Sequence, residues 1–346
     1  MKRKIIGLIV SASCILLAGC QNVQESSYRS GMSAVEANDF AAAQTLFEKA
    51  LADGESAKSV YRGKGIAYLG AGEYKDAIKA FEEALAQSNG IVEEADIDIS
   101  YYLAVAFYKD GQINEAVNTL NSIIAIKPER AQAYYLRGKI ELIQGSLDAA
   151  LLDYDKAVSL EQYDYDNYIR ICEDLREAGY ESESNAYIDK AMSLGKGLTD
   201  YRKGILEYYI GDYSSARTDL ENARKSDKGD NILLYLGKTY EALGDTDYAK
   251  SLYMDALAAN NSSGKLYNQL AMCQMNEGDY EAAIDTIENG LSSGNGESMQ
   301  GLMFNRVVAY EKIYDFSSAK QYIQEYLNAY PDDEVALREE VFLRTR

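Results

Sequence analysis

One stretch of the sequence decides the fold: GIAYLGAGEYKDAIKAFEEAL, residues 65–85. The segment 31–51 carries the same pattern 34 residues earlier. Five of its residues, Gly31, Phe40, Ala43, Phe47 and Ala50, recur as Gly65, Tyr74, Ala77, Phe81 and Ala84. Self-similarity at a fixed period of this length indicates a chain built from stacked structural repeats. We therefore expect one continuous architecture along most of the sequence.

A glycine turn recurs with nearly the same period. It begins at Gly72, Gly111, Gly145, Gly211, Gly244 and Gly278, and the third residue of the turn is mostly apolar. Glycine ends a helix in the left-handed conformation at little cost, so each turn separates two helices. The second helix carries small and large apolar residues at fixed spacing, as in Ala283, Ile287, Gly290 and Leu291.

This pattern resembles the tetratricopeptide repeat family, whose repeats of 34 residues fold as two antiparallel helices. The resemblance implies an all-α fold, a right-handed superhelical solenoid of about nine helix-turn-helix repeats over residues 28–333. We place the repeat starts near residues 24, 58, 97, 131, 165, 197, 230, 264 and 300. The fifth repeat is weak at Ser184, and the ninth has Asp315 and Phe316 in place of the glycine turn. Residues 87–96 are expected to form a longer loop between repeats.

Residues 334–346 are interpreted as a C-terminal capping helix. A solenoid needs a terminal element that covers its last open core. The segment offers Val335, Leu337, Val341, Phe342 and Leu343 for this role.

The N-terminus has the organisation of a secretory signal. Lys2, Arg3 and Lys4 precede an apolar stretch that is too short to span a bilayer comfortably. The stretch ends in Leu17, Ala18, Gly19 and Cys20, which resembles the bacterial lipobox. The resemblance implies a signal peptide over residues 1–19, lipidation at Cys20, and a short linker over residues 20–27. We expect a protein of the cell membrane, held by its lipid on the extracytoplasmic face.

Composition excludes several functions. The net charge is −20, and removal of the signal would make it −23, so nucleic acid is not an expected partner and the lipid anchor is the expected membrane contact. Histidine is absent, which removes the commonest general base and zinc ligand. Acidic clusters lack the spacing of a calcium loop. Cys172 and Cys273 fall within helical patterns as apolar packing residues. We predict no catalytic residues, no metal site and no cofactor.

Tyrosine is abundant, with 30 residues against 7 phenylalanines. Many tyrosines occupy large core positions, but others lie on the first helices, which form the concave face in the resembled family. Tyrosine gives a large contact area with a polar tip, which suits binding hot spots. An ordinary helix-surface or inter-repeat role is the alternative for these residues. The candidate partner-binding groove consists of Tyr101, Tyr108, Tyr135, Lys139, Tyr201, Tyr208, Tyr209 and Lys238, with Arg176 beside it.

The sequence thus favours a membrane-anchored scaffold of the bacterial cell envelope that binds protein partners. The alternative is a lipoprotein that binds peptides or cell-wall glycans, in which tyrosines would stack on sugars. The absence of tryptophan argues against the glycan function. An enzyme is not expected.

Overall fold

The structure is a computed structural model that describes residues 26–226, 229–259, 263–293, 298–331 and 333–346. These residues form nineteen α-helices, nine consecutive pairs and one last helix, and no strand occurs among them. The described residues divide into two compact units, one up to residue 187 and the other from residue 188 to residue 346. The lipobox, Cys20 and the signal segment lie outside the described residues.

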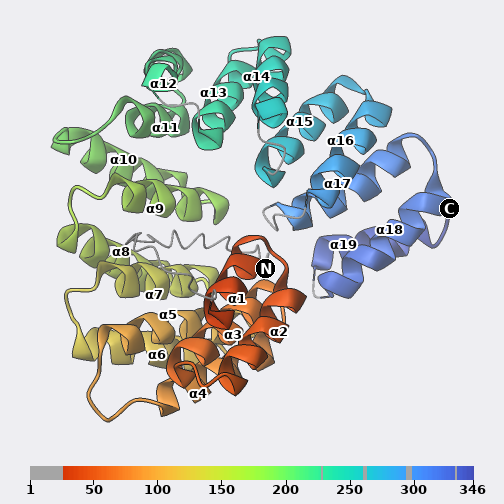
Figure 1. The fold of residues 1–346 in the computed structure, drawn as a ribbon. Coiled ribbons are helices and arrows are strands. Elements are labelled where there is room, and N and C mark those ends of the chain that lie inside the picture. Colours follow the sequence, from red (N-terminus) through yellow and green to blue (C-terminus); the bar gives the residue numbers. More distant parts are fainter. Residues whose placement is uncertain (1–25, 227–228, 260–262, 294–297, 332) are drawn as a thin grey trace, which may run out of the picture. The chain divides into compact units, whose positions relative to one another are not determined.

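Within each unit the helices run back and forth in chain order (Figure 1). The first unit holds α1 (Ser27–Glu36), α2 (Phe40–Ala52), α3 (Ala57–Gly70), α4 (Tyr74–Ala86), α5 (Glu94–Lys109), α6 (Ile113–Ile126), α7 (Ala131–Ile143), α8 (Leu147–Leu160) and α9 (Tyr165–Glu177). Helix α10 (Glu181–Leu194) runs across the division. The second unit holds α11 (Asp200–Ile210), α12 (Tyr213–Ser226), α13 (Asp230–Ala242), α14 (Thr246–Ala259), α15 (Gly264–Glu277), α16 (Tyr280–Ser292), α17 (Met299–Lys312), α18 (Phe316–Ala329) and α19 (Glu334–Leu343).

The nine first helices are the odd-numbered helices α1 to α17, and their starts agree with the predicted repeat starts to within three residues. The predicted long loop is also present, because α4 ends at Ala86 and α5 begins at Glu94. The all-α fold of paired helices is therefore confirmed.

One residue with positive φ ends the first helix of every repeat. These residues are Asn38, Gly72, Gly111, Gly145, Gly179, Gly211, Gly244, Gly278 and Tyr314. The ninth repeat keeps the turn without glycine, since Tyr314 adopts φ 62° and Asp315 accepts a hydrogen bond from the Ser318 backbone N–H at 3.1 Å. A side chain at positive φ is strained, so the cap and the packed helices must hold this turn.

Each repeat is closed by a contact between its two helices. The first-helix contact position lies seven residues before the turn residue and is buried in all nine repeats, at Gly31, Gly65, Ala104, Gly138, Cys172, Gly204, Gly237, Ala271 and Val307. In four repeats a glycine here meets an aromatic ring of the second helix. A Cβ built on Gly65 would lie 2.4 Å from Phe81 Cε1, and one built on Gly237 would lie 2.2 Å from Tyr253 Cε1.

The side-chain volume at the first-helix contact position complements the volume of the second-helix residue opposite it. Where the second helix supplies Leu120, Ile287 or Ile323, the contact position holds Ala104, Ala271 or Val307. Gly204, opposite Leu220, is the exception. Close packing requires this exchange, because an interior has no spare volume for both a large ring and an added methyl group.

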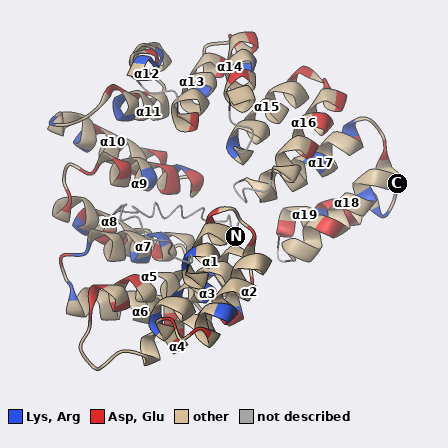
Figure 2. Ribbon diagram, viewed as in Figure 1, with Lys and Arg blue, Asp and Glu red and all other residues tan. Residues whose placement is uncertain are grey.

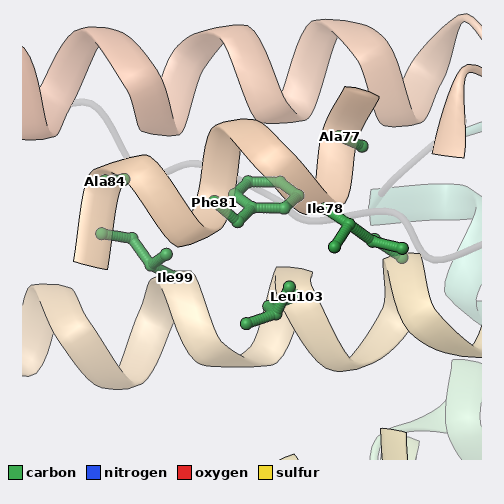
Figure 3. Packing of buried hydrophobic residues seen from close by; sticks show 7 residues of the cluster. Ala77, Ile78, Phe81, Ala84, Ile99 and Leu103 are labelled. Carbon is green, nitrogen blue, oxygen red and sulfur yellow. The ribbon is translucent and has the colours of Figure 1, made fainter. Parts of the chain in front are cut away.

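Second helices also pack against the following repeat. Phe81, Ile78 and Ala84 of α4 form a buried cluster with Ile99 and Leu103 of α5 (Figure 3). The core is therefore continuous from repeat to repeat within a unit, as expected for a solenoid.

Helix α19 differs from its expected role in one respect. Ala336 and Leu343 are buried against α18, as a cap requires. However, Leu337 and Phe342 are 43% and 40% exposed, so most of the apolar residues expected to cover the last core face outward. The reason is geometric, since one helix can turn only one side toward the repeat that it packs against.

Candidate partner-binding surface

First helices of successive repeats contact one another directly within each unit. Such contacts join α1 to α3, α3 to α5 and α7 to α9 in the first unit, and α11 to α13, α13 to α15 and α15 to α17 in the second. Side chains from adjacent first helices therefore share a surface, here called the first-helix surface. Acidic and basic residues are scattered over the helices of both units (Figure 2).

The second unit carries an aromatic cluster on this surface, made by Tyr208, Tyr209, Tyr213 and Tyr235. The ring centroids of Tyr208 and Tyr209 lie 5.4 Å apart, and each ring is edge-on to Tyr235, at 5.9 and 6.0 Å respectively. The hydroxyl oxygens of Tyr209 and Tyr235 are 2.9 Å apart. Edge-to-face contacts of this kind fix ring orientation. The structure thus brings the predicted pair Tyr208 and Tyr209 together around a buried ring.

Lys238 belongs to the same surface. Its Nζ lies 5.3 Å from the centroid of the Tyr235 ring, a cation–π contact between residues one helical turn apart. Tyr208 and Tyr209 are half-buried, and burial raises the pKa of Tyr208. Tyr201 is half-buried on α11, seven residues before Tyr208. Sequence reasoning missed Tyr235, although its place one turn before Lys238 could have revealed it.

In the first unit, Tyr135 is a core residue and does not project from the surface as expected. It is 4% exposed, and its hydroxyl donates to Asp174 Oδ2 at 2.9 Å. Lys139 Nζ lies 2.5 Å from the other oxygen of Asp174. The buried Tyr154 hydroxyl is also 3.4 Å from Asp174 Oδ2. Tyr135 is buried because it leans against α9, the first helix of the next repeat.

This arrangement is called the Asp174 network, formed by Tyr135, Lys139, Tyr154 and Asp174. It joins both helices of the fourth repeat to the first helix of the fifth. Burial raises the pKa of Asp174, although the charge of Lys139 acts in the opposite direction. The network therefore ties repeats together, and Lys139 is held in an internal ion pair.

Tyr101 and Tyr108 are both half-buried on α5. Burial raises the pKa of Tyr101 to about 12, and the backbone of Ala133 in α7 is beside its hydroxyl. Tyr101 thus also lies at the seam between two repeats. Arg176 is directed toward its own second helix, where its Nε donates to Ser184 Oγ at 3.1 Å.

Lys109 follows Tyr108 on α5 and was not predicted as a site residue. Burial lowers the pKa of this amine to about 8, and the nearby charge of Lys139 lowers it further in the same direction. No carboxylate of the described residues pairs with it. The sequence could have indicated Lys109 as a site residue, because it follows Tyr108 in its repeat as the predicted Tyr209 follows Tyr208 in another repeat.

Chemical features of a catalytic centre are not found among the described residues. No group of three acidic or cysteine residues is arranged to hold a metal ion in this part of the chain. Cys172 and Cys273 are buried, and burial raises the pKa of Cys172 to about 12 and that of Cys273 as well. Both thiols are therefore poor nucleophiles near neutral pH. None of the described helices combines the length and apolar character that crossing a bilayer requires.

The helices form antiparallel pairs that stack in chain order. In each pair a small residue of one helix contacts a large residue of the other. This architecture defines a helical-repeat protein. Family models for the tetratricopeptide repeat match residues 28–90, 68–140, 131–164, 201–264 and 264–293. The chain belongs to the tetratricopeptide repeat family.

The chain is also similar to several known proteins and solved structures. The BBSome complex member BBS4 of Bos taurus is 22% identical over 220 residues, which cover 64% of this chain and 36% of that protein. The chain thus spans about a third of the length of this relative. The crystal structure of yeast Tom70 is 16% identical, with a TM-score of 0.56, and covers 94% of this chain and 69% of its own. A tetratricopeptide repeat protein from Parabacteroides merdae is 14% identical, with a TM-score of 0.48 and coverage of 72% and 98%.

Proposed function

We propose that the protein is a membrane-anchored scaffold of the bacterial cell envelope that holds protein partners on its first-helix surface. Membership of the tetratricopeptide repeat family supports a role in protein interaction. The single observation that carries the proposed site is the aromatic cluster on α11, α12 and α13.

The cluster has the physical properties of a docking site. Tyr208 and Tyr209 each expose part of an apolar ring and are held by edge-on contacts to Tyr235. Their conformations are therefore largely fixed before a partner arrives, which lowers the entropic cost of binding. Lys238 adds a cation beside the rings, so a segment with an apolar residue next to an acidic one would fit this surface.

Replacing Tyr208 and Tyr209 together by Ala should weaken partner capture by about tenfold or more, because two hot-spot rings are lost. The measurement is a crosslinked pull-down from native membranes, followed by identification and quantification of the captured proteins. Tyr314→Ala is the matched control, since Tyr314 is 80% exposed at a turn away from the cluster and should not affect capture. Helical circular dichroism of each variant checks that the fold is retained.

Undiminished capture by the double variant would contradict the proposed surface. Capture of cell-wall glycan by the wild-type chain, with no discrete protein, would instead favour the peptide- or glycan-binding lipoprotein. Equal losses for Tyr314→Ala and the double variant would show that tyrosine content alone, and not this cluster, determines binding.

The proposed anchor is a lipid on Cys20. The tetrapeptide Leu17 to Cys20 after a basic and apolar leader supports it. Helix α1 begins at Ser27, so the intervening residues would span at most about 25 Å when extended, and the repeats would lie close to the membrane.

Cys20→Ser should abolish lipid attachment and leave the precursor unprocessed or released from the lipoprotein fraction. Membrane fractionation with metabolic labelling by a fatty acid measures both effects. Cys172→Ser is the matched control, because this thiol is buried in the repeats. Label retained on the Cys20→Ser protein would rule out Cys20 as the lipidated residue.

A further inference from the structure

Three charged side chains, Lys203, Glu207 and Asp219, meet between the two helices of the sixth repeat. Lys203 Nζ lies 2.6 Å from Asp219 Oδ2 and 3.2 Å from Glu207 Oε1. Glu207 is only 5% exposed, and its second oxygen, Oε2, is buried without a hydrogen-bond donor. Two carboxyl groups thus share one ammonium group. When all three groups are ionised, this cluster, here called the Glu207 cluster, carries one negative charge in excess.

The fourth repeat has the same residue types at the same spacing, in Arg137, Glu141 and Asp153, but arranges them differently. Arg137 binds both oxygens of Asp153, with Nε at 2.6 Å and Nη2 at 2.7 Å. A guanidinium group satisfies one carboxylate completely in this way, whereas a lysine presents a single ammonium group. Glu141 also leaves one oxygen without a donor, but its side chain is half-buried and Glu207 is buried. The excess charge is therefore enclosed more completely in the sixth repeat.

A buried carboxylate without enough partners is costly, and binding a proton removes the cost. Burial raises the pKa of Glu207 to about 7, and the nearby charge of Asp219 raises it too, while Lys203 acts in the opposite direction. Glu207 is therefore half-protonated close to neutral pH, whereas an ordinary glutamate is ionised there.

Other charged residues on the elements packed against α11 have partners of their own. They include Asp212, Glu221, Lys238 and Glu241. The charged groups that act on the Glu207 carboxyl are Lys203 on the same helix and Asp219 on α12.

We propose that a proton bound by the carboxyl pair Glu207 and Asp219 holds α11 against α12, and that loss of this proton loosens the two helices. An ionised Glu207 gains by reaching water, which requires the last turn of α11 to move away from α12. Tyr208 follows Glu207 directly, and its ring lies 5.6 Å from the ring of Tyr213 in α12. Loosening would therefore disturb the aromatic cluster. This effect on partner capture rests on the proposed function, whereas the opening of α11 does not.

The direction of the pH dependence follows from the two pKa values of Glu207. The closed helix pair holds the proton up to about pH 7, and an open α11 would release it near the ordinary value of 4.5. Opening should thus become easier as the pH rises from 4.5 through about 7. Hydrogen exchange of the full chain, followed by mass spectrometry and corrected for the chemical exchange rate, measures the opening constant of α11. We expect this constant to rise at least about fivefold between pH 5.5 and 7.5.

Glu207→Gln should give the same opening constant at both pH values, because the amide carries no charge. Asp219→Asn should remove most of the rise, since Lys203 would then neutralise Glu207 alone. The matched control is Asp200→Asn, because Asp200 is exposed in the first turn of the same helix, and this variant should keep the full rise. Helical circular dichroism checks the fold of each variant.

An opening constant of the wild-type chain that is equal at the two pH values would overturn the proposal. A rise that persists in both Glu207→Gln and Asp219→Asn would also overturn it, since another group would then be responsible. A rise that both variants remove and Asp200→Asn keeps would establish the proton-dependent pair. If partner capture then stayed the same at pH 5.5 and 7.5, the aromatic cluster would be excluded as the capture site while the opening of α11 stood.

Discussion

Asp174→Ala is expected to lower the free energy of unfolding by about 3 kcal/mol. The carboxylate accepts a hydrogen bond from Tyr135, lies 3.4 Å from the Tyr154 hydroxyl and pairs with Lys139 at 2.5 Å. Its removal leaves these groups without their acceptor at a seam that water reaches poorly, and unpaired buried polar groups are costly. Urea unfolding followed by helical circular dichroism measures the loss.

A matched control for this variant is Asp247→Ala. Asp247 pairs with Lys250 at 3.0 Å but is 94% exposed, so its removal should change stability by less than about 0.5 kcal/mol. Similar losses for the two variants would mean that the Asp174 network does not hold the repeats together.

Lys109→Met, in contrast, is expected to raise the free energy of unfolding. The folded chain lowers the pKa of Lys109 from 10.5 to about 8, so the charged amine costs stability below pH 8. Methionine removes that cost, and we expect the free energy of unfolding to rise by about 1 to 2 kcal/mol at pH 7. This is less than the whole pKa shift would give, because the side chain keeps partial solvent contact. The gain should shrink as the pH rises from about 8 toward 10.5. A gain that is independent of pH would mean that packing, not charge, is responsible.

Gly65→Ala should lower the free energy of unfolding by about 2 kcal/mol, because the new methyl group would overlap the Phe81 ring. The ideal Cβ position lies 2.4 Å from Phe81 Cε1, and a buried ring on a packed helix has little freedom to move. Alanine normally favours a helix over glycine by about 1 kcal/mol, so a net loss shows that the clash is the larger effect.

Two further variants test the cause. Phe81→Leu in the Gly65→Ala background should recover part of the loss, since Ala104 with Leu120 and Ala271 with Ile287 are natural combinations of this kind. Gly301→Ala is the control, because the atom nearest to its added Cβ is the Asn268 side-chain oxygen at 3.2 Å, and this variant should be neutral or stabilising. Strictly additive losses for Gly65→Ala and Phe81→Leu would contradict the complementarity of the two positions.

The helix pairs could be predicted from the sequence because their determinants are local. The turn residue, the contact position and the large residue of the second helix fall within a single repeat, at spacings that the pattern 65–85 displays directly. Even the altered ninth turn kept its place, since Asp315 still caps the following helix.

The partner-binding residues were less predictable because their surroundings come from other repeats. Tyr135 was expected on the surface, but its hydroxyl acceptor Asp174 is 39 residues away in sequence. Which side of α19 is buried likewise depends on the position of α18, the second helix of the ninth repeat. Apolar content alone could not distinguish the buried Leu343 from the exposed Val341.

The pairing of glycine with an aromatic ring also constrains how such a chain can be lengthened by gene duplication. A duplicated whole repeat carries both members of its pair and can be inserted without a clash. A recombination point between the two helices of a repeat could instead join a first helix with alanine, as at Ala104, to a second helix with phenylalanine, as at Phe81. In the recombined repeat the alanine methyl group would overlap the phenylalanine ring. Recombination points that preserve the fold should therefore fall between repeats.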